Sequence, residues 1–277
     1  MLALVVTVPA SEGELASDAL WALGVAAIEE RPADGDTDAT QDHFVELWTS
    51  LGDDVDAVTR AAEAFPKRWR WRTVTLDPAV AESWRAHAVP SWVDADLVIV
   101  PAWQDVPTPP TVLRVEIDPG AAFGLGDHPT TILSLRLLRE VQWPGASVLD
   151  VGCGSGVLGI VAARLGAPYV AAIDISPAAV TATDANARRN GVAGTVTAST
   201  TPLAAIDEQF DIVLANLLAP VVVDVAADLR RVTAPGGALI VSGVLEASHD
   251  HVVEALAPMR VVDTAVREAW AALLLRH

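Results

Sequence analysis

Several residue types that mark particular protein classes are scarce in this chain of 277 residues. A single cysteine excludes an internal disulfide and suits a reducing compartment such as the cytosol. Only Lys67 is a lysine, and 18 basic residues stand against 36 acidic ones, giving a net charge of −18. This acidity either repels nucleic acid and attracts basic partners or serves solubility alone. No apolar run approaches the length of a membrane span, and the first residues lack the basic start of a signal peptide.

The N-terminal part of the chain, residues 1–77, predicts a small domain of its own. Four short apolar runs and two segments with helical spacing alternate there in the order strand, helix, strand, strand, helix, strand, with the second helix over 53–65. This order predicts a ferredoxin-like α+β domain. After Lys67, arginine and tryptophan alternate over 68–72, and we interpret the run 67–72 as the two faces of a half-buried strand rather than as an RNA-binding stripe.

A helix over 78–90, bracketed by prolines, is predicted to link this domain to a second one over 91–277. The second domain opens with two apolar runs, 96–101 and 111–117, that a proline-rich segment joins. We interpret these two runs as a β-hairpin that leads into the domain.

The stretch 147–176 organises the second domain. An apolar run ends at Asp150, three glycines follow at alternate positions, and a helical segment leads to a second apolar run closed by Asp174. Strand, glycine turn, helix, strand and acid are typical of a nucleotide-binding βαβ unit, where glycines permit tight turns and the acid can hold ribose hydroxyls. Cys153 lies inside this loop, and we expect it to fill a tight turn rather than to act as a nucleophile.

The sequence of this loop is compatible with two cofactors. Residues 154–159 fit the GxGxxG pattern of NAD-binding folds, but a single match of this kind is weak evidence. Asp150, Gly152, Gly154 and Gly156 instead fit the alternating pattern of S-adenosylmethionine-dependent methyltransferases. Three further features favour the methyl donor: the chain closes with a helix and two strands, no second mononucleotide-binding half follows, and Asn216 stands where the strand over 210–214 ends.

A second candidate segment, residues 118–131, combines three glycines and two prolines and precedes a helix. Such a composition predicts an exposed loop of fixed shape rather than core. Pro129 and Thr131 fit the first turn of a helix, where free backbone N–H groups can bind an anion. His128 lies at the same helix start, and both a structural and a catalytic role remain open for it.

Four segments together resemble the ribosomal protein L11 methyltransferases, the PrmA family: DPGAAFGLGDHPTT, VLDVGCGSGVLGIVAARLGA, DIVLANLLAP and PGGALIVSGVL. The resemblance is strong over 118–245 and weak before residue 78. It implies a Rossmann-like, seven-stranded class I methyltransferase domain that uses S-adenosylmethionine, preceded by the ferredoxin-like domain, which would dock the substrate. The implied activity is methylation of lysine ε-amines and the N-terminal α-amine of a basic ribosomal protein in the cytosol.

By motif match, the resemblance implies that Thr131, Gly152, Asp174 and Asn216 contact the cofactor and that Phe123 lies against it. The neighbouring Gly154, Gly156 and Asp150 complete the predicted binding loop, in which Asp150 either fixes the loop or meets the ammonium group of the donor. Leu125 and Asp127 depart from the family pattern, in which threonine usually stands at the first of these positions.

For the reaction, we expect Asn216 to orient the amine, and His128 is the best candidate for a general base. No metal is expected, because the six histidines show no ligand spacing. Three alternatives remain: a methyltransferase acting on another protein lysine or a small molecule, an NAD-dependent oxidoreductase, and a non-catalytic ribosome-binding module. We expect a monomer with no direct binding of nucleic acid and no membrane association.

Overall fold

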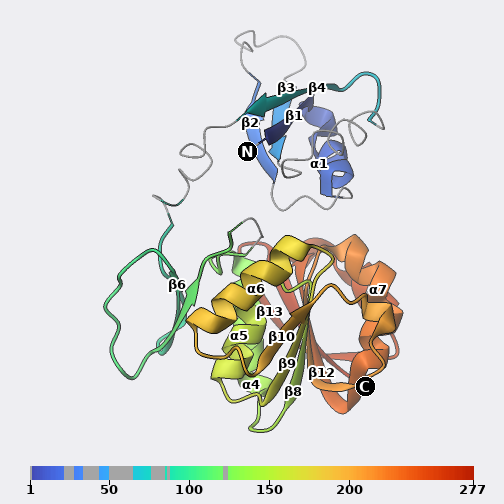
Figure 1. Cartoon of the computed structure of the whole chain (residues 1–277). Coiled ribbons are helices and arrows are strands. Elements are labelled where there is room, and N and C mark those ends of the chain that lie inside the picture. The colour runs from blue at the N-terminus through green and yellow to red at the C-terminus, as the bar shows by residue number, and fades with distance from the viewer. Residues whose placement is uncertain are drawn as a thin grey trace. The chain divides into compact units, whose positions relative to one another are not determined.

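The computed structural model describes residues 2–21, 28–33, 44–49, 65–75, 85, 88–120 and 124–277. The chain divides into two compact units, residues 1–88 and residues 89–277 (Figure 1). Most of each helix predicted over 53–65 and 78–90 lies outside the described residues, which include only residue 65 of the first range and residues 85 and 88–90 of the second.

The first unit is built on a four-stranded antiparallel sheet with the order β2-β3-β1-β4. Its described elements are β1 (Leu2–Pro9), a 3-10 turn η1 (Ala10–Glu12), α1 (Gly13–Trp21), β2 (Ile28–Pro32), β3 (Phe44–Thr49) and β4 (Arg70–Thr75). The first and the third strand in the sequence lie at the centre, as the predicted ferredoxin-like arrangement requires.

The two faces of this sheet carry different side chains. Leu4, Val6 and Leu47 are buried in the core, and Trp69, just before β4, packs into the same cluster. Arg72 lies on the other face, opposite Val5, where its guanidinium forms an ion pair with Glu46 at 2.7 Å. Of the run 67–72, Trp69 packs into the core and Arg72 lies on a charged sheet face, whereas Trp71 is 39% exposed. The prediction of a half-buried strand is therefore confirmed for Trp69 and wrong for Trp71, which lies on the edge strand β4.

A seven-stranded sheet with the order β10-β9-β8-β11-β12-β14-β13 forms the centre of the second unit. Its strands are β8 (Ser147–Val151), β9 (Tyr169–Ile173), β10 (Val196–Ser199), β11 (Phe210–Asn216), β12 (Thr233–Leu245), β13 (Arg260–Arg267) and β14 (Trp270–Arg276). Neighbours from β10 to β12 are parallel, whereas β14 is antiparallel to both of its neighbours. The predicted Rossmann-like sheet with an antiparallel closing hairpin is confirmed.

Helices cover both faces of this sheet (Figure 1). One apolar cluster joins the sheet to α4 (Pro129–Val141), α5 (Val157–Arg164) and α6 (Pro177–Arg189). A second cluster joins the opposite face to η3 (Leu203–Ala205), α7 (Ala219–Val232) and α8 (Asp250–Ala255), with η4 (Glu246–Ser248) before α8. Of the helices in the described ranges, none is long and apolar enough to cross a bilayer.

A separate three-stranded sheet corrects one prediction. It contains β5 (Ser91–Asp94), β6 (Leu97–Pro101) and β7 (Leu113–Ile117). The hairpin predicted from 96–101 and 111–117 is wrong, because β6 and β7 are parallel and the hairpin partner of β6 is β5. The physical reason is the long connection over 102–112. It can run back along the whole length of a short strand, so that β7 starts beside the start of β6 and the two strands are parallel. A hairpin needs a loop of only a few residues.

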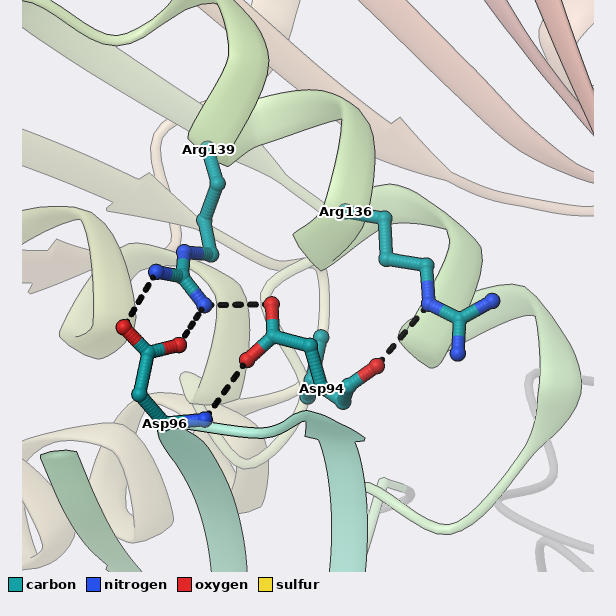
Figure 2. Close-up of polar contacts among 5 residues, drawn as sticks. Asp94, Asp96, Arg136 and Arg139 are labelled. Carbon is teal, nitrogen blue, oxygen red and sulfur yellow. Dashed lines mark hydrogen bonds and ion pairs between the residues drawn. The ribbon is translucent and has the colours of Figure 1, made fainter. Parts of the chain in front are cut away.

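Two arginines of α4 fasten that helix to the end of β5 and to the turn that follows it (Figure 2). The guanidinium of Arg139 pairs with the carboxylates of Asp94 and Asp96, reaching Asp96 at 2.6 and 3.0 Å, and Arg136 donates to the carbonyl oxygen of Val93 at 2.9 Å. The hydrogen bonds from Arg139 lower the pKa of Asp96 to about 2. This clamp fixes the orientation of α4, whose N-terminus carries two of the predicted site residues, His128 at the cap and Thr131 in the first turn.

Candidate functional site

The predicted site residues gather at one edge of the seven-stranded sheet. β8, β9 and β11 are neighbouring parallel strands, so that their carboxyl ends meet at the same edge. The glycine loop follows β8, Asp174 follows β9, and Asn216 is the last residue of β11. In open α/β sheets, ligands bind at the carboxyl ends of the strands. The topology therefore brings together the glycine loop and Asn216, although Gly152 and Asn216 lie 64 positions apart in the sequence.

The glycine loop adopts a conformation that side chains would oppose. Gly152, Gly154 and Gly156 have φ angles of 70°, 54° and 82°, in the left-handed region that glycine tolerates best. The N–H groups of Gly152 and Cys153 both donate to the carbonyl oxygen of Ile173, at 2.8 and 3.0 Å. The loop is thus hydrogen-bonded to the end of β9, immediately before Asp174.

Asp174 is held by backbone donors on both carboxylate oxygens. Gly154 donates to one oxygen at 3.0 Å, and Ser176 donates to the other at 2.9 Å. A carboxylate has about four acceptor positions, so each oxygen keeps the capacity to accept a hydroxyl. The next residue, Ile175, is 86% exposed, which places apolar surface directly beside this acid.

Asp150 is buried, with 1% of its surface exposed, and it serves the helix that follows the loop. Its carboxylate accepts the backbone N–H of Gly159 at 2.9 Å, in the first turn of α5. Gly156, the residue that caps α5, has no side chain, so Asp150 supplies the acceptor that a capping residue normally provides. Burial raises the pKa of Asp150 to about 7, and the Gly159 N–H opposes that rise.

Cys153 is buried between the loop and α6. Burial raises the pKa of its thiol, and the hydroxyl oxygen of Thr183 lies 3.3 Å from the sulfur. A thiol whose pKa is raised by burial stays protonated and unreactive near neutral pH. The geometry fits the predicted role as a small side chain in a tight turn.

His128 caps the N-terminus of α4. Its Nδ1 accepts the backbone N–H of Thr130 at 3.4 Å and lies 2.8 Å from the Thr130 hydroxyl oxygen. Because Nδ1 is an acceptor here, the neutral ring carries its proton on Nε2. Burial lowers the pKa of His128, against the nearby charges of Asp127 and Glu268. The ring also meets Trp270 edge to face, with centroids 5.1 Å apart.

Thr131 and Asn216 are in contact across the sheet edge. Thr131 is buried in the first turn of α4, and the amide nitrogen of Asn216 donates to its hydroxyl at 3.4 Å. These two residues lie 85 positions apart in the sequence. The structure therefore brings Thr131, Asn216, Asp174 and the glycine loop to one place, whereas the predicted contact residue Phe123 lies outside the described residues.

Two features of this region have no counterpart in the sequence-based prediction. Trp270 begins β14 and borders His128, but a tryptophan at the start of a strand carries no signal of such a position. On α6 and its C-cap, three polar residues are buried against the glycine loop and the chain around β7: Thr183, Asn186 and the C-cap residue Asn190. Their spacing of three and four residues marks one helix face, and this periodicity could have been recognised in the sequence.

Comparison with known proteins gives one consistent result. The family model described as ribosomal protein L11 methyltransferase (PrmA) matches residues 3–277. A ribosomal protein L11 methyltransferase from Cupriavidus necator is 37% identical over 281 residues, covering 92% of this chain and 90% of the relative. One from Symbiobacterium thermophilum is 40% identical over 211 residues, 76% of this chain and 68% of the relative. The crystal structure of a ribosomal protein L11 methylase from Lactobacillus delbrueckii subsp. bulgaricus superposes with a TM-score of 0.64 at 32% identity, covering 68% of this chain and 99% of that one.

Proposed function

Because the chain belongs to the ribosomal protein L11 methyltransferase (PrmA) family, we propose that it transfers methyl groups from S-adenosylmethionine to lysine ε-amines, the N-terminal α-amine, or both, of ribosomal protein L11. The observation that carries this proposal is the meeting of the glycine loop, Asp174 and the Thr131–Asn216 pair at the carboxyl edge of the sheet. The family uses S-adenosylmethionine as its methyl donor.

The residues at this edge fit that donor. The carboxylate of Asp174 is oriented by two backbone N–H groups and retains acceptor capacity for two ribose hydroxyls. Ile175 offers exposed apolar surface on which a flat purine ring can pack. We assign the amino-acid end of the donor to the glycine loop, where Gly152, Gly154 and Gly156 let the backbone approach closely. We assign Asp150 to holding α5 and the loop.

On the acceptor side, we assign Asn216 to orienting the amine. Its amide nitrogen points to Thr131, which leaves the amide oxygen to accept an N–H from the incoming amine. When bound, S-adenosylmethionine supplies an activated methyl group, so the protein mainly has to align the amine and deliver it uncharged. A lysine has an ordinary pKa near 10.4, and removal from water lowers that value. The amine must lose one proton for each methyl group gained, and we assign this proton to water.

We assign His128 a positioning role rather than that of a base. Its Nδ1 is occupied by Thr130, and its Nε2 carries the proton of the neutral ring, so neither nitrogen has an acceptor lone pair free for the amine. The ring instead fixes the first turn of α4, which carries Thr131. The sequence-based suggestion of His128 as general base therefore gains no support from this geometry.

We propose that the first unit docks the protein substrate. Its described helix α1 packs against the sheet face that carries Leu4 and Val6. On the opposite face, the guanidiniums of Arg31 and Arg72 lie 4.4 and 5.5 Å from the ring centre of Trp48. Trp and Arg are both enriched in protein recognition surfaces, and this enrichment supports the proposal.

The test of this assignment is the Asn216→Ala variant. We expect the turnover number with L11 to fall about 10- to 100-fold, because the amine loses its alignment. Binding of S-adenosylmethionine, measured by calorimetry, separates an effect on the donor from an effect on the amine, and thermal unfolding checks that the variant is folded. Unchanged turnover would remove Asn216 from the mechanism. Binding of the donor without transfer to L11 by the wild type would direct the search to other proteins or to small molecules.

A further inference from the structure

Helix α6 presents a polar stripe to the interior of the second unit. Thr183 and Asn186 are fully buried, and Asn190 is 8% exposed. Helix faces that pack against a core are normally apolar, and buried polar side chains persist where their hydrogen bonds are made. The hydrogen bonds of this stripe go to the glycine loop on one side and to the end of β7 on the other.

Asn186 is the residue that joins the two sides. Its side-chain nitrogen donates to the carbonyl oxygens of Asp118 and Ser155, both at 2.9 Å. Its side-chain oxygen accepts the N–H of Asp118 at 3.0 Å and a guanidinium N–H of Arg189 at 2.6 Å. Both donors and the acceptor oxygen are therefore used, and one side chain links the glycine loop to the residue that follows β7.

Two neighbouring hydrogen bonds strengthen this link. The hydroxyl of Thr183 donates to the carbonyl oxygen of Gly154 at 3.0 Å. The hydroxyl of Ser155 donates to the carbonyl oxygen of Gly124. The backbone of the glycine loop is thus held from α6 at Gly154 and Ser155, while its N–H groups remain directed to β9 and Asp174.

We propose that Asn186 is a positioning residue for the methyl donor: it holds the glycine loop in its binding conformation before the donor arrives. This proposal rests on the proposed function, in which that loop binds S-adenosylmethionine. Three glycines in the left-handed region give the free loop many alternative conformations. When only a fraction of molecules has the binding conformation, the apparent dissociation constant rises by the inverse of that fraction.

The same helix offers a matched control. Asn190 is also a buried asparagine, and it accepts the N–H of Glu116 at 2.9 Å and donates to its carbonyl oxygen at 2.7 Å. Its remaining hydrogen bond goes to the carbonyl oxygen of Asn186, within α6. Asn190 thus makes the same type of contact with the chain around β7 as Asn186 does, and none of its hydrogen bonds goes to the glycine loop.

The experiment compares Asn186→Ala with Asn190→Ala in the full-length protein. We expect Asn186→Ala to weaken S-adenosylmethionine binding by calorimetry about tenfold or more, the effect of losing hydrogen bonds that order the loop. Asn190→Ala should change it less than about threefold at a similar loss of thermal stability. In assays with L11, the KM for S-adenosylmethionine should rise for Asn186→Ala, with little change in kcat at saturation. Faster hydrogen exchange of the loop amides 152–156 should accompany this change.

A second variant covers the case in which Asn186→Ala does not fold. Thr183→Val keeps the shape of the side chain and removes its hydrogen bond to Gly154, and we expect it to weaken donor binding about threefold or more. Equal effects of the two asparagine variants on binding, or no effect of Asn186→Ala and Thr183→Val, would overturn the proposal. Failure of the wild type to bind S-adenosylmethionine would instead overturn the proposed function, so the two failures are distinguishable.

Discussion

The buried carboxyl of Asp150 makes the stability of the second unit depend on pH in a predictable way. Burial raises its pKa from 3.8 to about 7, so the folded protein binds a proton at Asp150 that the unfolded chain releases. The stabilisation from this proton is complete below pH 3.8 and is lost as the pH rises through 7. Asp150→Asn removes the titration and keeps a side-chain oxygen that can accept the Gly159 N–H.

The size of the effect follows from the two pKa values. The difference between 3.8 and about 7 corresponds to roughly 4 kcal/mol of unfolding free energy once the pH exceeds 7. Between pH 5 and pH 7, the wild type should lose about 2 kcal/mol relative to Asp150→Asn. Any constant cost of the amide group cancels, because the comparison concerns the change with pH and not the stability at one pH.

The assay is urea unfolding of both proteins from pH 5 to pH 8 at fixed ionic strength, without cofactor. Because the chain has two units, hydrogen exchange of amides in β8 and α5 should report the transition of the second one. Between pH 5 and pH 7, we expect the unfolding free energy of the variant to rise by about 2 kcal/mol relative to that of the wild type. Parallel profiles from pH 5 to pH 8 would refute the argument that Asp150 is protonated by burial.

Two further predictions concern the frame of the site. The hydrogen bonds from Arg139 lower the pKa of Asp96 to about 2, so they contribute stability that is present above pH 3.8 and lost as the pH falls toward 2. Asp96→Asn removes this titration, and its melting temperature should therefore fall less steeply with acid than that of the wild type. An equally steep fall in the variant would contradict this. A Cβ on Gly243 would lie 2.2 Å from the carbonyl oxygen of Leu217, the residue after Asn216. Gly166 also has a positive φ, but a Cβ there would meet nothing within 4 Å. Gly243→Ala should therefore lower the unfolding free energy by at least about 2 kcal/mol more than Gly166→Ala. Equal losses in urea unfolding would show that the backbone contact does not matter.

Much of the second unit could be predicted from local sequence patterns. Apolar runs bounded by glycine and acid place β8 and β9, and the glycine spacing predicts the left-handed turns found at Gly152, Gly154 and Gly156. The predicted closing helix and two strands are present as α8, β13 and β14. Local patterns succeed here because each turn and strand is encoded by its own residues.

Pairings between distant segments were harder to predict. The parallel register of β6 and β7 depends on the path of residues 102–112, which no local pattern encodes. The polar stripe of α6 could be recognised as periodic, but its partners around Asp118 and Ser155 emerge only when three segments pack together. The contact between His128 and Trp270 likewise joins two segments whose proximity depends on the whole sheet.

The most direct test of the central claim is the intact mass of unmethylated ribosomal protein L11 after incubation with the protein and S-adenosylmethionine. The account predicts mass increases in steps of one methyl group with the wild type, slower steps with Asn216→Ala, and loss of the steps with Asp174→Ala at low donor concentration. An unchanged mass with the wild type, under conditions in which calorimetry shows bound donor, would contradict the proposed substrate. Equal rates for all three proteins would contradict the proposed site.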